Sequence, residues 1–255
     1  PSAAHSGAGE GCAGPFPSAA HSGAASLLRA GRFPSAAHSR AGELARRGFF
    51  LSLDGIDGTG KSTQCRLLAE WLREQGRSVV ACADPGGTPL GDELRRLVLD
   101  HRQEMGPWAE ALLFMASRAE LVRQVIRPAL DAGSVVVCDR FLLANVVYQG
   151  HAGGLDPEEL WRVGRLVTGG LEPDLTVVLD LPVGAALRRR GRPADRMEAR
   201  DLAYSERVRQ GFLAEAARGG ERFEVIDASP PVDEVQRRLR EVVGRRLKPG
   251  AAEAR

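Results

Sequence analysis

A glycine-rich octapeptide constrains the fold of this chain more than any other feature. Residues 55–62 read Gly-Ile-Asp-Gly-Thr-Gly-Lys-Ser, which matches the pattern G-x-x-x-x-G-K-[ST], and they lie between an apolar run and a helical pattern. Strand, glycine loop and helix in this order form a cradle for phosphate oxygens. The Lys61 ammonium can reach the terminal phosphates, and the Ser62 hydroxyl can bind Mg²⁺. The sequence therefore predicts a nucleoside triphosphate and Mg²⁺, held by Gly55, Gly58, Thr59, Gly60, Lys61, Ser62 and Thr63.

Apolar runs of strand length alternate with helical patterns along the rest of the chain. Strands are predicted at 49–53, 78–82, 134–138, 175–179 and 222–226, and helices at 63–75, 91–99, 108–130, 158–168, 199–217 and 232–247. Strands separated by helices form parallel sheets covered on both faces. The expected fold class is α/β, a three-layer P-loop NTPase fold with a five-stranded parallel sheet flanked by helices. Its ligands should lie beyond the carboxyl ends of the strands.

The first 47 residues differ from the rest of the chain in composition. Pro-Ser-Ala-Ala-His-Ser occurs three times, at 1–6, 17–22 and 34–39, in a segment with few residues that could form a core. Residues 1–47 are therefore predicted to be a low-complexity, disordered extension. A metal-binding array of the repeated histidines is disfavoured by their wide spacing. The folded domain is expected at 48–248, followed by a flexible tail at 249–255.

Charge and cysteine usage exclude several classes of protein. The net charge is +2, and because residues 1–47 hold five arginines and two glutamates, the remaining chain is close to neutral. Such a balance does not favour a nucleic-acid partner. No apolar run is long enough to span a bilayer. Four scattered cysteines, Cys12, Cys65, Cys82 and Cys138, fit reduced thiols better than disulfides. A cytoplasmic protein with no nucleic-acid or membrane partner is expected.

Other motifs narrow the class of nucleotide-binding protein. A GTPase would carry an Asn-Lys-x-Asp signature, but Asn145 is the only asparagine in the chain. The strand at 134–138 is followed by Asp139-Arg140, which sets a cation beside the acid. An arginine at this place favours an acceptor that carries its own phosphate.

These motifs together resemble those of thymidylate kinases, a family of P-loop nucleoside-monophosphate kinases. The similarity covers 49–243 and rests on the order of six segments: 57–63, 84–88, 113–118, 139–141, 148–150 and 173–176. The resemblance implies transfer of the γ-phosphoryl group of ATP to dTMP with Mg²⁺, and a homodimer. Two positions depart from the family pattern Arg-Glu-Pro-Gly-Gly, since Ala83 replaces the arginine and Asp84 the glutamate.

The resemblance also implies roles for individual residues. Asp57 would contact the 3′-hydroxyl of the acceptor sugar and, with Ser62 and Asp139, would hold Mg²⁺. The catalytic groups would be Lys61, Asp57, Arg140 and an arginine of the lid. The lid resembles the Arg-rich stretch 188–198, in which Arg192 is the candidate, although the sequence does not distinguish it from its neighbours. Gly58 stands where some relatives carry a phosphate-loop arginine.

The acceptor pocket is implied in the same way. Phe114 would stack on thymine and Arg118, four residues later on the same helical face, would hydrogen-bond it. Arg95 and Arg140 would hold the acceptor phosphate, and Tyr148 would disfavour ribonucleotides. Asn145 and Gln149 complete the predicted pocket. Two alternatives stay open at this point: a P-loop kinase for another nucleoside monophosphate or a deoxynucleoside, and a non-catalytic nucleotide-binding protein.

Overall fold

A single parallel sheet forms the centre of the protein. The computed structural model describes residues 48–100, 102, 104–189 and 201–247. In this part of the chain the strands run in the order β2-β3-β1-β4-β5, and each neighbouring pair is parallel. Their bounds are β1 Phe49–Asp54, β2 Val79–Ala83, β3 Val135–Asp139, β4 Leu175–Asp180 and β5 Phe223–Asp227. The five predicted strands and the predicted fold class are confirmed.

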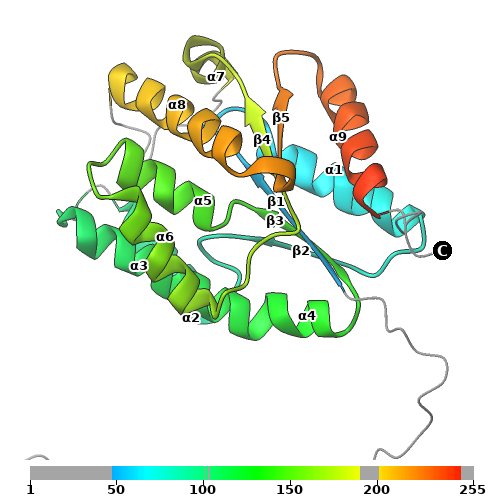
Figure 1. Cartoon of the computed structure of the whole chain (residues 1–255), viewed down its shortest axis with the longest axis horizontal. Helices are drawn as coiled ribbons and strands as arrows, with labels where there is room; N and C mark the ends of the chain where they lie inside the picture. The colour runs from blue at the N-terminus through cyan, green and yellow to red at the C-terminus, as the bar shows by residue number, and fades with distance from the viewer. Residues whose placement is uncertain (1–47, 101, 103, 190–200, 248–255) are drawn as a thin grey trace, which may run out of the picture. The chain divides into compact units, whose positions relative to one another are not determined.

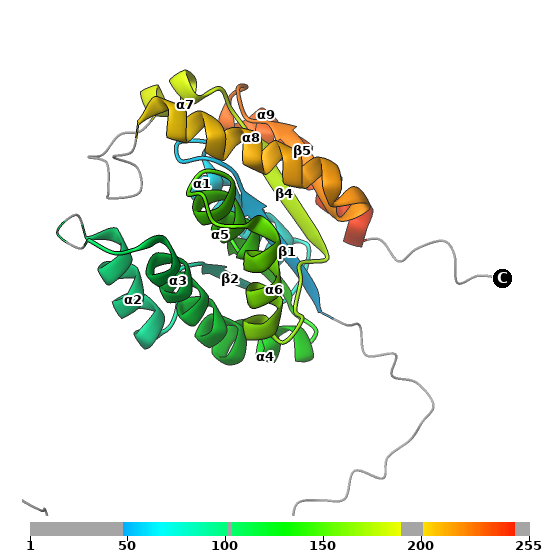
Figure 2. The same cartoon turned by 60° about the vertical axis from the view of Figure 1, so that its left-hand side comes forward.

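Helices cover both faces of this sheet. The α-helices are α1 Lys61–Glu74, α2 Pro89–Leu99, α3 Pro107–Leu121, α4 Arg127–Asp131, α5 Leu142–Asn145, α6 Pro157–Thr168, α7 Val183–Arg189, α8 Leu202–Arg218 and α9 Val232–Leu247. Two π-helical segments, η1 Val122–Ile126 and η2 Val146–His151, and a 3₁₀ turn, η3 Gly220–Arg222, complete the elements. Helices α1 and α9 lie on one side of the sheet, and α3, α5, α6 and α8 lie on the other (Figures 1 and 2).

The central strand β1 is buried on both faces, which fixes it in the middle of the core. Leu51 and Leu53 pack in the cluster that includes α1 and α9, whereas Phe50 packs with residues of α3 and α6 and stacks edge-on against Phe141. All three β1 side chains are 0–1% exposed. Burying them stabilises the fold by about 1.5–3 kcal/mol each. The loop that follows β1 therefore starts from a rigid support.

Short polar residues set where several helices begin. The Thr88 hydroxyl accepts a hydrogen bond from the Gly91 N–H at the start of α2, and Asp201 does the same for Tyr204 at the start of α8. These caps satisfy backbone donors that a helix leaves unpaired. Thr88 ends the short segment that links β2 to α2 and carries Asp84, so the cap fixes one end of that segment.

Two helical predictions were wrong in part. The helix expected at 108–130 is divided into α3, the π-helical η1 and α4, and the segment 142–151, for which no helix was predicted, is helical as α5 and η2. The run Leu-Leu-Ala-Asn-Val-Val at 142–147 has no polar face, because most of it is buried under α6 and α8. Without an exposed face the 3.6-residue periodicity disappears. The predictions for 1–47 lie outside the described residues.

None of the helices in the described ranges combines the length and the apolar character that crossing a bilayer requires.

Candidate active site

A cleft of about 750 Å³ opens at the carboxyl ends of β1, β2 and β3. It brings together most of the residues predicted for the site. Those that line it are Asp57, Gly58, Thr59, Gly60, Lys61, Ser62, Thr63, Arg95, Phe114, Arg118, Asp139, Arg140, Asn145, Tyr148 and Gln149. Gly55 lies behind them, where its carbonyl oxygen accepts a hydrogen bond from Arg140. Arg192 lies outside the described residues.

The glycines of the phosphate loop allow a backbone that other residues would resist. Gly58 and Gly60 have φ angles of 88° and 90°, in the left-handed region. A Cβ atom at Gly58 would overlap the carbonyl oxygen of Ala186 in α7, so no side chain fits there. Gly60 is the N-cap of α1, whose N-terminus therefore faces the loop. A helix N-terminus with free N–H groups attracts phosphate oxygens.

Lys61 is held under the loop. Its side chain is only 6% exposed, and its Nζ atom donates to the Ile56 carbonyl at 2.8 Å and lies 3.9 Å from Asp57 Oδ1. Burial and the nearby charge of Arg140 lower the pKa of Lys61 to about 8, against the opposing effect of the acidic neighbours. The ammonium is thus the main form at neutral pH. A negatively charged group entering the cleft would raise this pKa again.

Ser62 and Asp139 form a pair of oxygen ligands. The Ser62 hydroxyl donates to Asp139 Oδ2 at 2.5 Å, which joins the start of α1 to the end of β3. Hard oxygen donors suit Mg²⁺, which is usually bound by one or two protein groups together with water and phosphate. The pair therefore fits a magnesium ion that also contacts a bound triphosphate.

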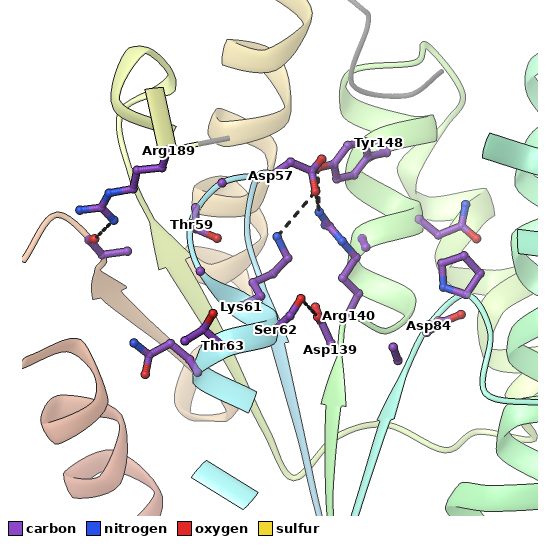
Figure 3. A pocket seen from close by; sticks show the side chains of 18 of the residues that line it. Asp57, Thr59, Lys61, Ser62, Thr63, Asp84, Asp139, Arg140, Tyr148 and Arg189 are labelled. Atoms are coloured by element: carbon purple, nitrogen blue, oxygen red, sulfur yellow. Dashed lines mark hydrogen bonds and ion pairs between the residues drawn. The ribbon is translucent and has the colours of Figure 1, made fainter. Parts of the chain in front are cut away.

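Arg140 and Tyr148 enclose Asp57 (Figure 3). Arg140 Nη2 donates to Asp57 Oδ1 at 2.5 Å, and the Tyr148 hydroxyl donates to Oδ2 at 2.9 Å. The Arg140 guanidinium also lies 5.0 Å from the centre of the Tyr148 ring. Burial alone would raise the pKa of Asp57, but the charges of Arg140 and Lys61 hold it well below its usual value. Asp57 is therefore a permanent anion directed toward Arg140 and Tyr148.

The backbone at Arg140 is unusual. Its φ of 71° makes it the one non-glycine residue with a positive φ in the described ranges. The left-handed turn costs about 1–2 kcal/mol for such a residue. Its N–H still donates to the Leu53 carbonyl of β1 at 2.9 Å, and its carbonyl oxygen accepts from the Cys138 thiol. As a result Asp139 turns toward Ser62, while Arg140 turns toward Asp57 (Figure 3).

A buried ion pair lies at the other end of the cleft. Arg118 Nε donates to Asp84 Oδ2 at 2.5 Å, and both side chains are at most 2% exposed. Asp84 Oδ1 has no hydrogen-bond partner. Burial raises the pKa of Asp84, and the Arg118 charge opposes this shift. The sequence analysis marked Asp84 only as a departure from a motif, yet it is the ionic partner of a predicted pocket residue.

Amide side chains extend this pair into a longer hydrogen-bonded row. Arg118 Nη1 donates to Asn145 Oδ1 at 3.0 Å, Asn145 Nδ2 to Gln149 Oε1 at 2.7 Å, and Gln149 Nε2 to Glu110 Oε1 at 2.8 Å. The sequence analysis missed Glu110. A charged residue eight positions before Arg118 in an otherwise apolar helical stretch was the available signal.

The remaining predicted residues differ in exposure. Arg95 is exposed, and its Nη1 donates to the Pro85 carbonyl at 2.7 Å, whereas Phe114 is half-buried in the wall of the cleft. Arg189, at the end of α7, donates to the carbonyls of Ala228 and Ser229 at 2.7 and 2.8 Å. It thus joins α7 to the segment before α9, and both Arg189 and Ala228 line the cleft.

Comparisons with known proteins agree with this geometry. The thymidylate kinase family model matches residues 53–239. The chain is 51% identical over 185 residues to a thymidylate kinase of Rhodopirellula baltica, covering 72% of this chain and 76% of the relative. A thymidylate kinase of Deinococcus radiodurans is 46% identical over 200 residues, with 77% and 97% covered.

A solved structure is also similar. The crystal structure of thymidylate kinase from Ehrlichia chaffeensis matches with a TM-score of 0.65 and 31% sequence identity, over 77% of this chain and 98% of that chain. The family model spans most of the described sheet and its helices. With its phosphate loop, its paired Asp139 and Arg140 and these relatives, the chain belongs to the thymidylate kinase family.

Proposed function

We propose how the cleft carries out the reaction of this family. The protein is an ATP-dependent nucleoside-monophosphate kinase that phosphorylates dTMP to dTDP with ATP and Mg²⁺, a step of dTTP biosynthesis. We assign one side of the cleft to ATP and the other to dTMP. The observation that carries this assignment is the backbone turn at Arg140. Asp139 faces Ser62 at the start of α1, whereas Arg140 faces Asp57 and Tyr148, where the loop meets the acceptor side of the cleft.

The phosphate-loop side binds ATP in this proposal. Backbone N–H groups of the loop and the N-terminus of α1 surround the phosphates, and Lys61 neutralises charge on the transferring phosphoryl group. Ser62 and Asp139 would hold Mg²⁺, which would supply neutralisation of the charge on the phosphates. Because both oxygens of Asp57 already accept hydrogen bonds from Arg140 and Tyr148, Asp57 acts on the acceptor rather than as a direct metal ligand.

The opposite side of the cleft binds dTMP. We call it the acceptor pocket and define it by Arg95, Phe114, Arg118, Arg140, Asn145, Tyr148 and Gln149, which all line the cleft. Arginine forks match phosphate oxygens, so Arg95 and Arg140 hold the 5′-phosphate. Phe114 stacks on thymine, and Arg118 and Asn145 hydrogen-bond its edge. The attacking phosphate oxygen is already anionic, so positioning and charge neutralisation suffice without a strong general base.

A coupled assay of ADP release tests this assignment. The unmodified enzyme is given ATP, Mg²⁺ and one of several acceptors: dTMP, dUMP, dCMP, dGMP, AMP or thymidine. We expect dTMP to give the highest kcat/KM. A preference for a purine monophosphate or for the nucleoside would contradict the thymine pocket. ADP release that no acceptor stimulates would contradict the kinase assignment as a whole.

We further propose that the enzyme is a homodimer. Five large apolar side chains are exposed on α2, α3 and α6, which pack against one another (Figure 2): Leu90, Leu97, Trp108, Leu112 and Leu166. A second copy of the same surface would cover them. Leu112→Glu with Leu166→Glu should convert a dimer to a monomer in light scattering. The matched control is Leu202→Glu, an exposed leucine on α8, and a monomeric unmodified protein would refute the proposal.

The segment 48–248 is proposed to carry the activity alone. The described elements from β1 to α9 contain the whole cleft. Deleting residues 1–47 should leave kcat and KM for dTMP within about twofold. A folded truncated protein without dTMP-dependent turnover would contradict this expectation.

We also propose that the enzyme works in the cytoplasm. Cys65, Cys82 and Cys138 are free thiols, and Cys65 and Cys138 are buried. Reduced cysteines are typical of that compartment. Cell fractionation with an antibody to the protein tests the location, and recovery in a membrane or secreted fraction would contradict it.

A further inference from the structure

A row of four buried side chains runs from the acceptor pocket to a carboxylate outside it. The row is Arg118, Asn145, Gln149 and Glu110, joined by the three hydrogen bonds of 3.0, 2.7 and 2.8 Å. Each member is at most 3% exposed. The first three line the cleft, whereas Glu110 does not. In this row Glu110 is connected to the pocket through Gln149.

The chemistry at the two ends gives the row a direction. A guanidinium can only donate hydrogen bonds, and a carboxylate can only accept them. Between Arg118 and Glu110, each amide must accept from the arginine side and donate toward the glutamate side. Turning either amide over would set donor against donor or acceptor against acceptor, and such an unsatisfied buried pair is costly. The two ends thus fix one orientation for Asn145 and for Gln149.

This orientation matters for the base edge. Arg118 presents donors beside the acceptor Oδ1 of Asn145. Thymine offers an acceptor, O4, beside the donor N3–H, which complements this order. Cytosine carries a donor amino group at C4 and an acceptor at N3, which is the reverse. A reversed Asn145 amide would present a donor to N3, which fits cytosine, and the distinction between the two bases would then rest on Arg118 alone.

We propose that Glu110 is a positioning residue that orients Gln149, and through it Asn145, so that the acceptor pocket favours a thymine edge over a cytosine edge. This inference rests on the proposed function, in which the pocket binds the base of dTMP. Glu110 does not touch the substrate. Its contribution is the carboxylate oxygen that accepts the last hydrogen bond of the row, from Gln149.

The central test replaces Glu110 with methionine, which has a similar length but cannot accept the Gln149 hydrogen bond. Dissociation constants for dTMP, dUMP and dCMP are measured by titration calorimetry, and KM and kcat by the coupled assay. For Glu110→Met, we expect about tenfold weaker dTMP binding and a loss of about tenfold in the dTMP-to-dCMP preference. The dTMP-to-dUMP ratio should not change, because both bases share the same edge. The KM for ATP should not change either.

Three further variants complete the design. Glu110→Gln retains an acceptor oxygen and should stay within about threefold of the native enzyme. Glu120→Met is the matched control, since Glu120 lies on the same helix and its carboxylate accepts hydrogen bonds from Arg123 and Gln124, outside the row. Glu110→Asp withdraws the acceptor by one methylene and should give the same changes at smaller amplitude. It replaces Glu110→Met in the test if the methionine variant does not fold.

A double variant separates failure of this inference from failure of the proposed function. If Glu110 acts through Gln149, adding Glu110→Met to Gln149→Met should change the base preference no further. Additive effects, or an equal loss of dTMP, dCMP and ATP binding in Glu110→Met, would overturn the positioning role. An effect of Gln149→Met with none of Glu110→Met would also overturn it. If Gln149→Met itself leaves dTMP binding unchanged, the acceptor pocket of the proposed function is wrong.

Discussion

A buried carboxyl at the end of β1 gives the most quantitative prediction. Asp54 is fully buried, its Oδ2 accepts from the Ser52 hydroxyl at 3.1 Å, and its Oδ1 has no hydrogen-bond partner among the residues that the structure describes. Burial raises the pKa of Asp54 from 3.8 to about 6, despite the opposing charges of Arg140 and Lys61. We predict that the substitution Asp54→Asn changes the free energy of unfolding more favourably at neutral and alkaline pH than at acidic pH.

The magnitude follows from linkage between protonation and folding. Because the folded pKa of Asp54 lies above the unfolded value, the folded state binds more protons between pH 3.8 and about 6. The contribution of Asp54 to stability is therefore complete at low pH and is lost as pH rises through the folded pKa. A shift of about two pKa units corresponds to about 3 kcal/mol in total, of which about 1.4 kcal/mol develops between pH 5 and pH 8.

Urea denaturation followed by circular dichroism at intervals from pH 5 to pH 8 measures this effect. The free energy of unfolding of Asp54→Asn minus that of the native protein should grow by about 1.4 kcal/mol across this range. Asp227→Asn is the control. A hydrogen bond from the Ser229 backbone lowers the pKa of Asp227, so its difference should be flat above pH 5. A flat or falling difference for Asp54→Asn would refute the reasoning.

Three further predictions concern the cleft. Lys61→Ala should lower kcat by about 10²–10³-fold in the coupled assay, with a far-UV spectrum like that of the native protein, because it removes charge directed at the transferring group. Arg118→Ala should cost about 3–5 kcal/mol in urea denaturation, since it leaves Asp84 without its buried cation, and should weaken dTMP binding while the KM for ATP stays constant. Tyr148→Ala should raise kcat/KM for ribonucleotides relative to deoxyribonucleotides by opening the sugar side of the pocket, and an unchanged ratio would contradict that role.

Much of the fold could be predicted because its signals are local. The strand at 49–53 and the loop at 55–62 are adjacent in the sequence, and the glycines, Lys61 and Ser62 carry their chemistry in their own spacing. Each of the five strands is bounded by turn or helix residues, so periodicity alone located it. The order β2-β3-β1-β4-β5 was not predicted, because it depends on how the connecting helices pack.

The rest of the site depends on contacts that are distant in the sequence. Asp84 and Arg118 are 34 residues apart, and Gln149 and Glu110 are 39 apart. No spacing rule indicates which buried acid meets which donor. The helical turns around Asn145 were missed for a related reason, because a segment buried on all sides shows no amphipathic period. Tertiary packing, rather than local preference, determines these parts.

The left-handed turn at Arg140 also bears on how such an enzyme can diverge. In the function that we propose, one peptide unit separates Asp139, on the side of the metal and the triphosphate, from Arg140, on the side of the acceptor. Asparagine or glycine would adopt this backbone more easily, but neither has a guanidinium fork. The donor side and the acceptor side of the cleft therefore meet at one rigid backbone turn. Under this proposal, residues of the acceptor pocket such as Phe114 and Asn145 can be exchanged to accept a new monophosphate, while Ser62 and Asp139 continue to bind the same phosphate donor and its metal.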